Sequence, residues 1–315
     1  MGNDYNSLYF KQLKYDKENI SFLKKNNFSL KEINNFSDLK KNNFNYLDIN
    51  TIFCYQGFYY NETKLKKFKN LKFLVSNTTS DTFIDHKYCK KKKIKILTLS
   101  KSQKFLKKIT PTAEHTVGLI IALTRNYVNA ISSPVWDRRP YAGNKMLSKS
   151  TIGIIGGGRL GLKVNEIMKA FGSKIILAEI KNKNFKKKIN EICLKADIVT
   201  LHIPEKNNKK FFSEKNFKFK NEFFLINTSR GEIVDEKYII KLLKKKIMIG
   251  YAADVIEGEF RSNFRLSKNI LYKNRKKLNI LLTPHIGGST RDAWKITERK
   301  IIIELKKELD ILLHL

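Results

Sequence analysis

The chain has 315 residues, of which 42% are hydrophobic, and 63 Lys and Arg against 29 Asp and Glu give a formal net charge of +34 at pH 7. This length and apolar content allow one large or two medium domains and exclude a disordered protein, while apolar runs such as residues 117–123 are too short to cross a bilayer. The N-terminus has no signal-peptide pattern, and Cys54, Cys89 and Cys193 form neither a disulfide framework nor a metal-binding motif, so we expect a cytoplasmic protein without a metal site.

The first half of the chain shows a mixed pattern of strands and helices. Its first fifty residues are rich in Lys and Asn and weakly periodic, so no element is predicted there. Buried strands are expected at residues 50–55, 71–76 and 95–99, with a helix-compatible stretch at 62–69. Strands that alternate with helical segments indicate parallel βαβ units.

A second series of strands follows a long helix. The pattern over residues 110–128 is amphipathic, and Pro111 and Glu114 suit the first turn of a helix. Residues 129–150 resemble a loop. Further buried strands, again alternating with helical segments, are expected at residues 151–155, 174–179, 197–203, 223–227, 249–255 and 279–283.

The last helix closes the predicted fold. It is expected over residues 289–314, with Ser289 and Asp292 spaced as a capping box. The pattern predicts an α/β protein of two doubly wound domains, the second inserted into the first. We expect one domain from residues 1–109 and 290–315, and the other from residues 110–289.

A glycine motif carries the sharpest local signal. In TIGIIGGGRLG, a β-branched strand runs into Gly156, Gly158 and Gly161, and a helix follows. The first glycine permits a tight turn, the second allows a pyrophosphate to approach the backbone, and the third lets helix and strand pack closely. The pyrophosphate is expected at the helix N-terminus, beside Arg159 and Leu160.

Glu179 indicates which dinucleotide binds. It ends the strand after the glycine motif, where an acidic side chain can accept hydrogen bonds from both ribose hydroxyls and repel a 2′-phosphate. We therefore predict NAD as the cofactor. Lys181 and Lys183 lie nearby and leave NADP as the alternative.

Three later segments each end a predicted strand with a chemically useful side chain. They are INTSRGEIVDE with Arg230, AADVIEGE with Glu259, and TPHIGGS with His285. Taken singly, Arg230 is better explained as a surface residue and His285 as a structural one. Together they match hydride transfer to a 2-keto acid, which needs a cation for the carboxylate, an acid for the developing alkoxide and a carboxylate that keeps the acid charged.

With these motifs, the chain resembles the D-isomer-specific 2-hydroxyacid dehydrogenases, most closely the phosphoglycerate dehydrogenase branch. The matching segments are TAEHTVGLIIALTRN, WDR, TIGIIGGGRLG, INTSRGEIVDE, AADV and LLTPHIGGST, over roughly residues 70 to 295. The resemblance implies two Rossmann-like domains, with an NAD-binding domain (residues 110–289) inserted into a flavodoxin-like substrate domain (residues 1–109 and 290–315). It implies an NAD-dependent enzyme acting on a small D-2-hydroxy or 2-keto acid, with 3-phosphoglycerate as one possibility. It implies Arg230 as substrate binder, His285 as acid/base and Glu259 as its partner.

The resemblance also implies further contacts. It assigns the nicotinamide amide to Asp254, and the cofactor groove to His202, Pro204, Thr228 and Gly287. It assigns part of the substrate carboxylate to the loop of Ser80, and a homodimer interface to the loop of Trp136.

The sequence departs from the family pattern at several positions. Phe260 replaces the usual Pro after Glu259, so Glu257 is an alternative partner for the histidine, and Ser80 stands where Gly is common. Glu205 and Lys206 replace the usual Leu-Thr after TLHIP. The loop before the last strand is basic, and the chain stops after the long helix, so we expect no appended regulatory domain.

Two other functions stay open. A catalytically retired, NAD-sensing interaction protein has the same fold, but the intact Arg, Glu and His set argues against it. The net charge suggests a nucleic-acid binder. However, Lys far outnumbers Arg and Asn is abundant, a pattern that A+T-rich coding produces, and the runs at residues 90–93 and 244–246 sit where helices should end. We therefore expect neither nucleic acid nor membrane as a partner.

Overall fold

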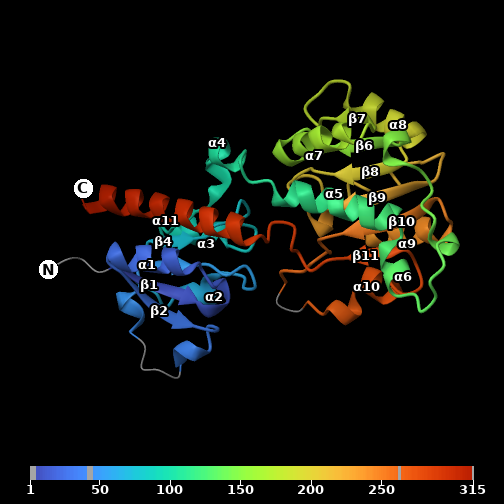
Figure 1. Cartoon of the computed structure of the whole chain (residues 1–315). Helices are drawn as coiled ribbons and strands as arrows, with labels where there is room; N and C mark the ends of the chain where they lie inside the picture. Colours follow the sequence, from blue (N-terminus) through green and yellow to red (C-terminus); the bar gives the residue numbers. More distant parts are fainter. Residues whose placement is uncertain (1–4, 41–44, 262–263, 314–315) are drawn as a thin grey trace. The chain divides into compact units, whose positions relative to one another are not determined.

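The computed structural model describes residues 5–40, 45–261 and 264–313. The chain divides into two compact units (Figure 1). The first unit holds residues 5–40, 45–109, 260–261 and 290–313, and the second holds residues 110–259 and 264–289. Within these described ranges, no helix is long and apolar enough to cross a membrane.

The first unit is built on a five-stranded parallel sheet in the order β2-β1-β3-β4-β5. This order is the flavodoxin-like one, and it changes direction between β1 and β3. The strands are β1 (Tyr5–Phe10), β2 (Phe28–Ile33), β3 (Thr51–Phe53), β4 (Phe73–Val75) and β5 (Lys95–Leu97).

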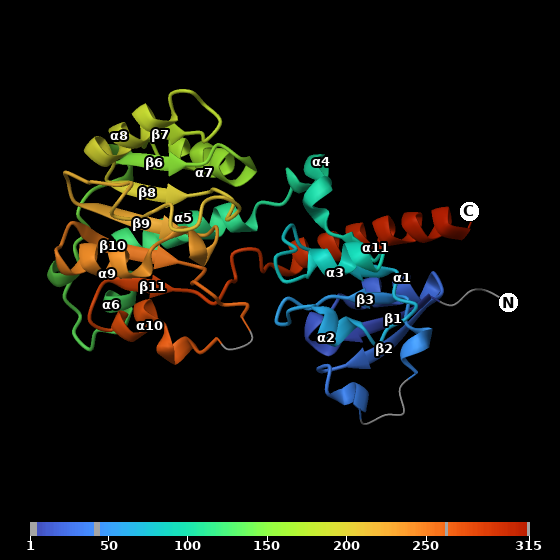
Figure 2. The same ribbon diagram turned by 180° about the vertical axis from the view of Figure 1, so that it is seen from behind.

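Helices cover both faces of this sheet. Alternate strand residues point to opposite faces, so Leu8 and Phe10 pack toward α2 and α3, whereas Tyr9 packs toward α1, α4 and α11. The last helix, red in Figures 1 and 2, therefore belongs to the first unit although it ends the chain. The helices are α1 (Lys17–Lys25), α2 (Glu62–Leu65), α3 (His86–Lys91), α4 (Gln103–Leu106) and α11 (Arg291–Leu313).

The second unit holds a six-stranded parallel sheet in the order β11-β10-β9-β8-β6-β7. Its buried β-branched and aromatic residues form near-continuous apolar runs, as expected for a sheet covered on both faces. The strands are β6 (Thr151–Ile155), β7 (Lys174–Ala178), β8 (Ile198–Leu201), β9 (Phe223–Asn227), β10 (Met248–Ala253) and β11 (Ile280–Leu282).

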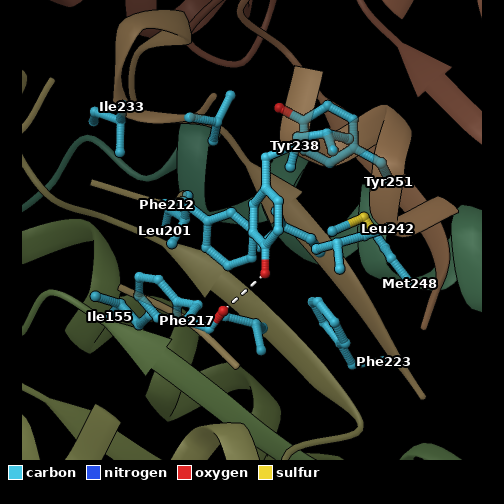
Figure 3. Packing of buried hydrophobic residues seen from close by; sticks show 14 of the residues in the cluster. Ile155, Leu201, Phe212, Phe217, Phe223, Ile233, Tyr238, Leu242, Met248 and Tyr251 are labelled. Carbon is cyan, nitrogen blue, oxygen red and sulfur yellow. Dashed lines mark hydrogen bonds between the residues drawn. The ribbon is translucent and has the colours of Figure 1, made fainter. Parts of the chain in front are cut away.

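Two helical layers enclose this second sheet. α5 and α7 cover one face, and α5 lies in front of the sheet in Figure 1 and behind it in Figure 2. α8, α9 and α10 cover the other face over an aromatic core, in which the Tyr238 hydroxyl donates to the Phe217 carbonyl at 2.7 Å (Figure 3). The helices are α5 (Pro111–Thr124), α6 (Tyr127–Ile131), α7 (Arg159–Ala170), α8 (Phe185–Lys195), α9 (Glu236–Lys244) and α10 (Ile270–Asn274).

This architecture confirms the predicted fold class, with two corrections to its elements. The helix expected over residues 110–128 breaks at Asn126, whose φ of 53° lies in the left-handed region. The helix expected from Ser289 begins at Arg291, and the Thr290 carbonyl accepts the first helical hydrogen bond, so the predicted capping box is wrong. The predicted end at His314 lies outside the described residues.

Candidate active site

The predicted site residues of the second unit gather at one edge of its sheet. All six strands are parallel, so their carboxyl ends meet at the same edge. The strand order reverses beside β6, since β7 lies on one side of it and β8 on the other, and such a switch point is where open α/β sheets bind ligands. The residues that follow these strand ends are Gly156, Gly158, Glu179, His202, Pro204, Thr228, Arg230, Asp254, Glu259, His285 and Gly287.

The glycine turn after β6 leaves no room for side chains at two positions. Gly156 has φ of +110°, and a Cβ there would lie 2.3 Å from the carbonyl oxygen of His202. A Cβ on Gly161 would lie 2.0 Å from the carbonyl oxygen of Gly156. By contrast, a Cβ on Gly158, the residue before α7, would meet nothing within 4 Å. The turn is therefore closed toward the protein and open at the helix N-terminus, where an anion is favoured.

Glu179 lies against the same turn. A Cβ on Gly157 would sit 2.1 Å from Glu179 Oε1, so the carboxylate rests over the glycine backbone. The side chain predicted to bind the ribose thus lies beside the turn predicted to bind the pyrophosphate.

His202, directly after β8, is held in its neutral form. Its Nε2 lies 3.0 Å from Thr200 Oγ1, and burial lowers its pKa to about 4. A neutral imidazole here leaves the positive charge of the site to other residues.

The pKa of His202 predicts a pH-dependent stability. Because its pKa falls from 6.5 in the unfolded chain to about 4 in the fold, His202 contributes stability above pH 6.5 that is lost as the pH falls toward 4. The loss should reach up to about 3 kcal/mol. Denaturant titrations between pH 4 and 7 should show a shallower pH dependence in His202→Gln than in the exposed control His86→Gln. Equal slopes in both variants would contradict this assignment.

Hydrogen bonds shape the loop after β9. Thr228 Oγ1 lies 2.8 Å from Thr116 Oγ1 of α5, and Asn227 Nδ2 donates to the Arg230 carbonyl at 2.9 Å. The Arg230 backbone is extended, and its guanidinium donates to the Ser229 carbonyl at 2.6 Å. A guanidinium carries five N–H donors, so this contact uses a small part of its capacity.

Asp254, after β10, anchors the loop that carries His285. Its carboxylate is almost fully buried and accepts hydrogen bonds from the backbone N–H groups of Ile286 at 2.8 Å and Gly287 at 2.7 Å. The Asp254 carbonyl accepts from the His285 N–H at 2.9 Å. His285 itself has a φ of +55°, an unusual conformation for a residue with a side chain. The three bonds hold that conformation.

Two half-buried side chains, Thr283 and His115, lie beside Asp254. Thr283 Oγ1 donates to Asp254 Oδ1 at 2.6 Å, and His115 Nε2 of α5 lies 3.0 Å from Thr283 Oγ1 and 3.4 Å from Asp254 Oδ1. Burial by itself raises the pKa of Asp254, but the hydrogen bonds it accepts outweigh burial and hold its pKa below the usual value. Asp254 is therefore a charged anchor of the loop.

Glu259 and His285 form the central contact of the site. His285 Nδ1 lies 2.8 Å from Glu259 Oε1, and the two side chains are 30% and 15% exposed. A carboxylate on one ring nitrogen fixes the orientation of the imidazole and leaves the other nitrogen to act on a ligand. The backbone N–H of Glu257 donates to Glu236 Oε1 at 3.0 Å.

Two predicted residues belong to other parts of the chain. Ser80 follows β4 in the first unit, where its Oγ lies 3.1 Å from Thr82 Oγ1. Trp136 lies in the loop between α6 and β6 and is fully exposed. Among the described residues, no group of three or more His, Cys, Asp and Glu could hold a metal ion.

The site also contains residues that the sequence did not single out. His115 supports Asp254, and Glu232 and Glu236 accept backbone N–H groups of the turn that ends in Glu259. Both glutamates lie inside the segment INTSRGEIVDE, and His115 lies inside TAEHTVGLIIALTRN. Their hydrogen-bond partners belong to other segments, so only the folded structure shows which groups they bind.

Comparison with known proteins identifies the family. The model of the D-isomer specific 2-hydroxyacid dehydrogenase NAD-binding domain matches residues 117–287, more than half of the chain. The protein therefore belongs to the D-isomer specific 2-hydroxyacid dehydrogenase family and carries its NAD-binding domain, as the sequence predicted.

Individual relatives carry different names. D-3-phosphoglycerate dehydrogenase of Methanocaldococcus jannaschii is 34% identical over 212 residues, which are 62% of this chain and 38% of the relative, so the match spans well under two thirds of that protein. Aromatic 2-oxoacid reductase of Clostridium sporogenes is 30% identical over 252 residues, 74% of this chain and 75% of the relative. In structure, D-lactate dehydrogenase from Escherichia coli superposes with a TM-score of 0.78 at 18% identity over 97% of each chain, which shows the shared fold.

Proposed function

We propose that the protein is an NAD-dependent oxidoreductase that interconverts a small 2-keto acid and the corresponding D-2-hydroxy acid. The observation that carries this proposal is the 2.8 Å contact between Glu259 and His285 at the sheet edge that also holds the glycine turn. Family membership supports the same chemistry.

The residues after β6 and β7 suit NAD. The open helix N-terminus beyond Gly158 suits the pyrophosphate, beside Arg159 and Leu160, and the carboxylate of Glu179 suits the ribose diol. His202, Pro204, Thr228, Asp254 and Gly287 are the further cofactor residues of this proposal. When bound as NADH, the cofactor supplies the hydride.

The remaining residues bind the substrate or transfer a proton to it. Arg230 holds the carboxylate of the keto acid through parallel hydrogen bonds, which fixes the C2 carbonyl. His285, protonated and oriented by Glu259, donates a proton to the C2 oxygen as hydride arrives at carbon. The backbone around Ser80 in the first unit is our proposal for a further contact to the substrate.

A panel of 2-keto acids tests the function. Purified protein should oxidise NADH with at least one of glyoxylate, pyruvate, phenylpyruvate, hydroxypyruvate or 3-phosphohydroxypyruvate, followed by absorbance at 340 nm. The panel includes a phosphorylated acid because the relatives' names cover both kinds of substrate. Tight NADH binding without turnover on any of them would instead favour a catalytically retired NAD sensor.

Glu179 should set the cofactor preference. Its carboxylate repels a 2′-phosphate, so we expect a Michaelis constant for NADH at least about tenfold lower than for NADPH, since one unfavourable charge contact costs roughly 1.4 kcal/mol. Glu179→Ala should narrow or reverse this difference, whereas Glu214→Ala, on an exposed glutamate of the same unit, should leave it unchanged. Equal use of both cofactors by the unmodified enzyme would mean that Lys181 or Lys183 accepts the phosphate.

Helix α6 and the loop between α6 and β6 are our proposed contact with a second copy of the chain. Together they expose several large apolar side chains, and such residues, when they gather on one surface, mark interaction sites. Analytical ultracentrifugation should give a dimer for the unmodified chain and a shift toward monomer for Trp136→Asp. A monomer at all concentrations would contradict the proposal. The exposed residues are Tyr127, Val128, Ile131, Val135, Trp136 and Met146.

The three cysteines are free and buried. This fits a compartment that keeps thiols reduced, so we place the protein in the cytoplasm.

A further inference from the structure

The glutamate that orients His285 stands on a tight turn. Gly258 has φ of +77°, and the Glu259 N–H donates to the Ile256 carbonyl at a long 3.4 Å. A bond of that length is weak, and a glycine in this region adds freedom, so the turn by itself does not fix the carboxylate. Something outside the turn must hold it.

Two carboxylates from the segment after Arg230 provide that hold. The Gly258 N–H donates to Glu232 Oε1 at 3.0 Å, and the Glu257 N–H donates to Glu236 Oε1 at 3.0 Å. Both are backbone N–H groups bonded to carboxylates, which makes these hydrogen bonds stronger than neutral ones.

The two segments also touch directly. A Cβ on Gly231 would lie 2.0 Å from the carbonyl carbon of Ile256, so the backbones pack against one another without space between them. Gly231 follows Arg230 in the chain, and Glu232 follows Gly231. The loop that bears the proposed substrate clamp therefore also holds the turn that bears the partner of the histidine.

Glu232 and Glu236 differ in burial and in the groups that they bind. Glu236 is buried. Its carboxylate also accepts hydrogen bonds from Asn269 Nδ2, which lies 3.0 Å from Oε1 and 2.8 Å from Oε2; Asn269 is the residue directly before α10. Burial raises the pKa of Glu236, in keeping with a structural role. Glu232 is half-buried and binds the N–H of the residue directly before Glu259.

We propose that Glu232 is a positioning residue for the proposed reaction: by accepting the Gly258 N–H, it keeps Glu259 within hydrogen-bond distance of His285. The requirement is for an acceptor oxygen at this position, and an amide oxygen supplies one as a carboxylate does. The turnover readout of this inference rests on the proposed function, and a spectroscopic readout does not.

Three variants test it on the full-length protein. Glu232→Ala should lower kcat for the best keto acid about tenfold, the loss expected when one positioning hydrogen bond is removed. Glu232→Gln should stay within about twofold of the unmodified enzyme, and so should the control Glu214→Ala. The dissociation constant of NADH should be unchanged in all three. If Glu232→Gln is as impaired as Glu232→Ala, negative charge rather than the acceptor is what matters, and the inference is overturned.

A double variant separates positioning from general stability. If Glu232 acts only through Glu259, then adding Glu232→Ala to Glu259→Gln should lower kcat by less than about twofold. Independent, multiplying losses would contradict the inference.

The hydrogen bond itself can be observed without catalysis. In protein labelled with ¹⁵N-histidine, the Nδ1–H proton of His285 should resonate far downfield in the unmodified protein and in Glu232→Gln. The same signal should disappear in Glu232→Ala and in Glu259→Gln. A signal that persists in Glu232→Ala overturns the inference even if the protein reduces no keto acid.

Discussion

His285→Gln should reduce keto-acid turnover about a thousandfold while leaving NADH binding intact. General acid catalysis contributes roughly 10²- to 10⁴-fold, and glutamine has no acidic proton to give to the developing alkoxide. Steady-state kinetics at saturating NADH measure the loss, and quenching of protein fluorescence by NADH measures binding.

His86→Gln is the matched control for this variant. His86 begins α3 in the first unit, where its Nε2 lies 3.4 Å from Asp81, and it has no part in the proposed chemistry. It should retain full turnover. Near-normal activity in His285→Gln would show that another group protonates the substrate, and joint loss of turnover and NADH binding would show a structural role.

Arg230→Lys should cost about a hundredfold in kcat/KM although the charge is kept. Lysine is a compact point charge and cannot form the two parallel hydrogen bonds that a guanidinium makes to a carboxylate. Losing that grip should raise the barrier by roughly 3 kcal/mol. The exposed Arg291→Lys, at the start of α11, is the control that should leave kcat/KM unchanged. Near-normal kcat/KM in Arg230→Lys would mean that the substrate carboxylate binds elsewhere.

Much of the second unit could be predicted because its strands are buried on both faces. Each appears in the sequence as a short apolar run between polar segments, and all six observed strands lie within about two residues of their predictions. In the first unit, β1 (Tyr5–Phe10) includes Asn6 and Ser7, and β2 (Phe28–Ile33) includes Lys31 and Glu32 at the edge of the sheet. Their pairing with neighbouring strands, rather than their own periodicity, makes them strands.

The sequence predicted the site residues that lie in the loops directly after strands. Arg230 and Glu259 follow adjacent strands, so parallel topology alone brings their loops to one edge. The closeness of Glu259 to His285 depended on more than topology, because Phe260 left Glu257 as a second candidate. Which glutamate faces the imidazole is decided by the turn at Gly258 and by the carboxylate of Glu232, and both act through backbone N–H groups that sequence patterns do not reveal.

Transfer of deuterium from [4-²H]NADH, prepared with the label on either face, to the most active keto acid tests the central claim most directly. We predict that one of the two labelled forms places deuterium on C2 of the product and that the product is the D-2-hydroxy acid. His285→Gln should form this product about a thousandfold more slowly. A product of L configuration, or a reduced product without deuterium at C2 from either form, would contradict it.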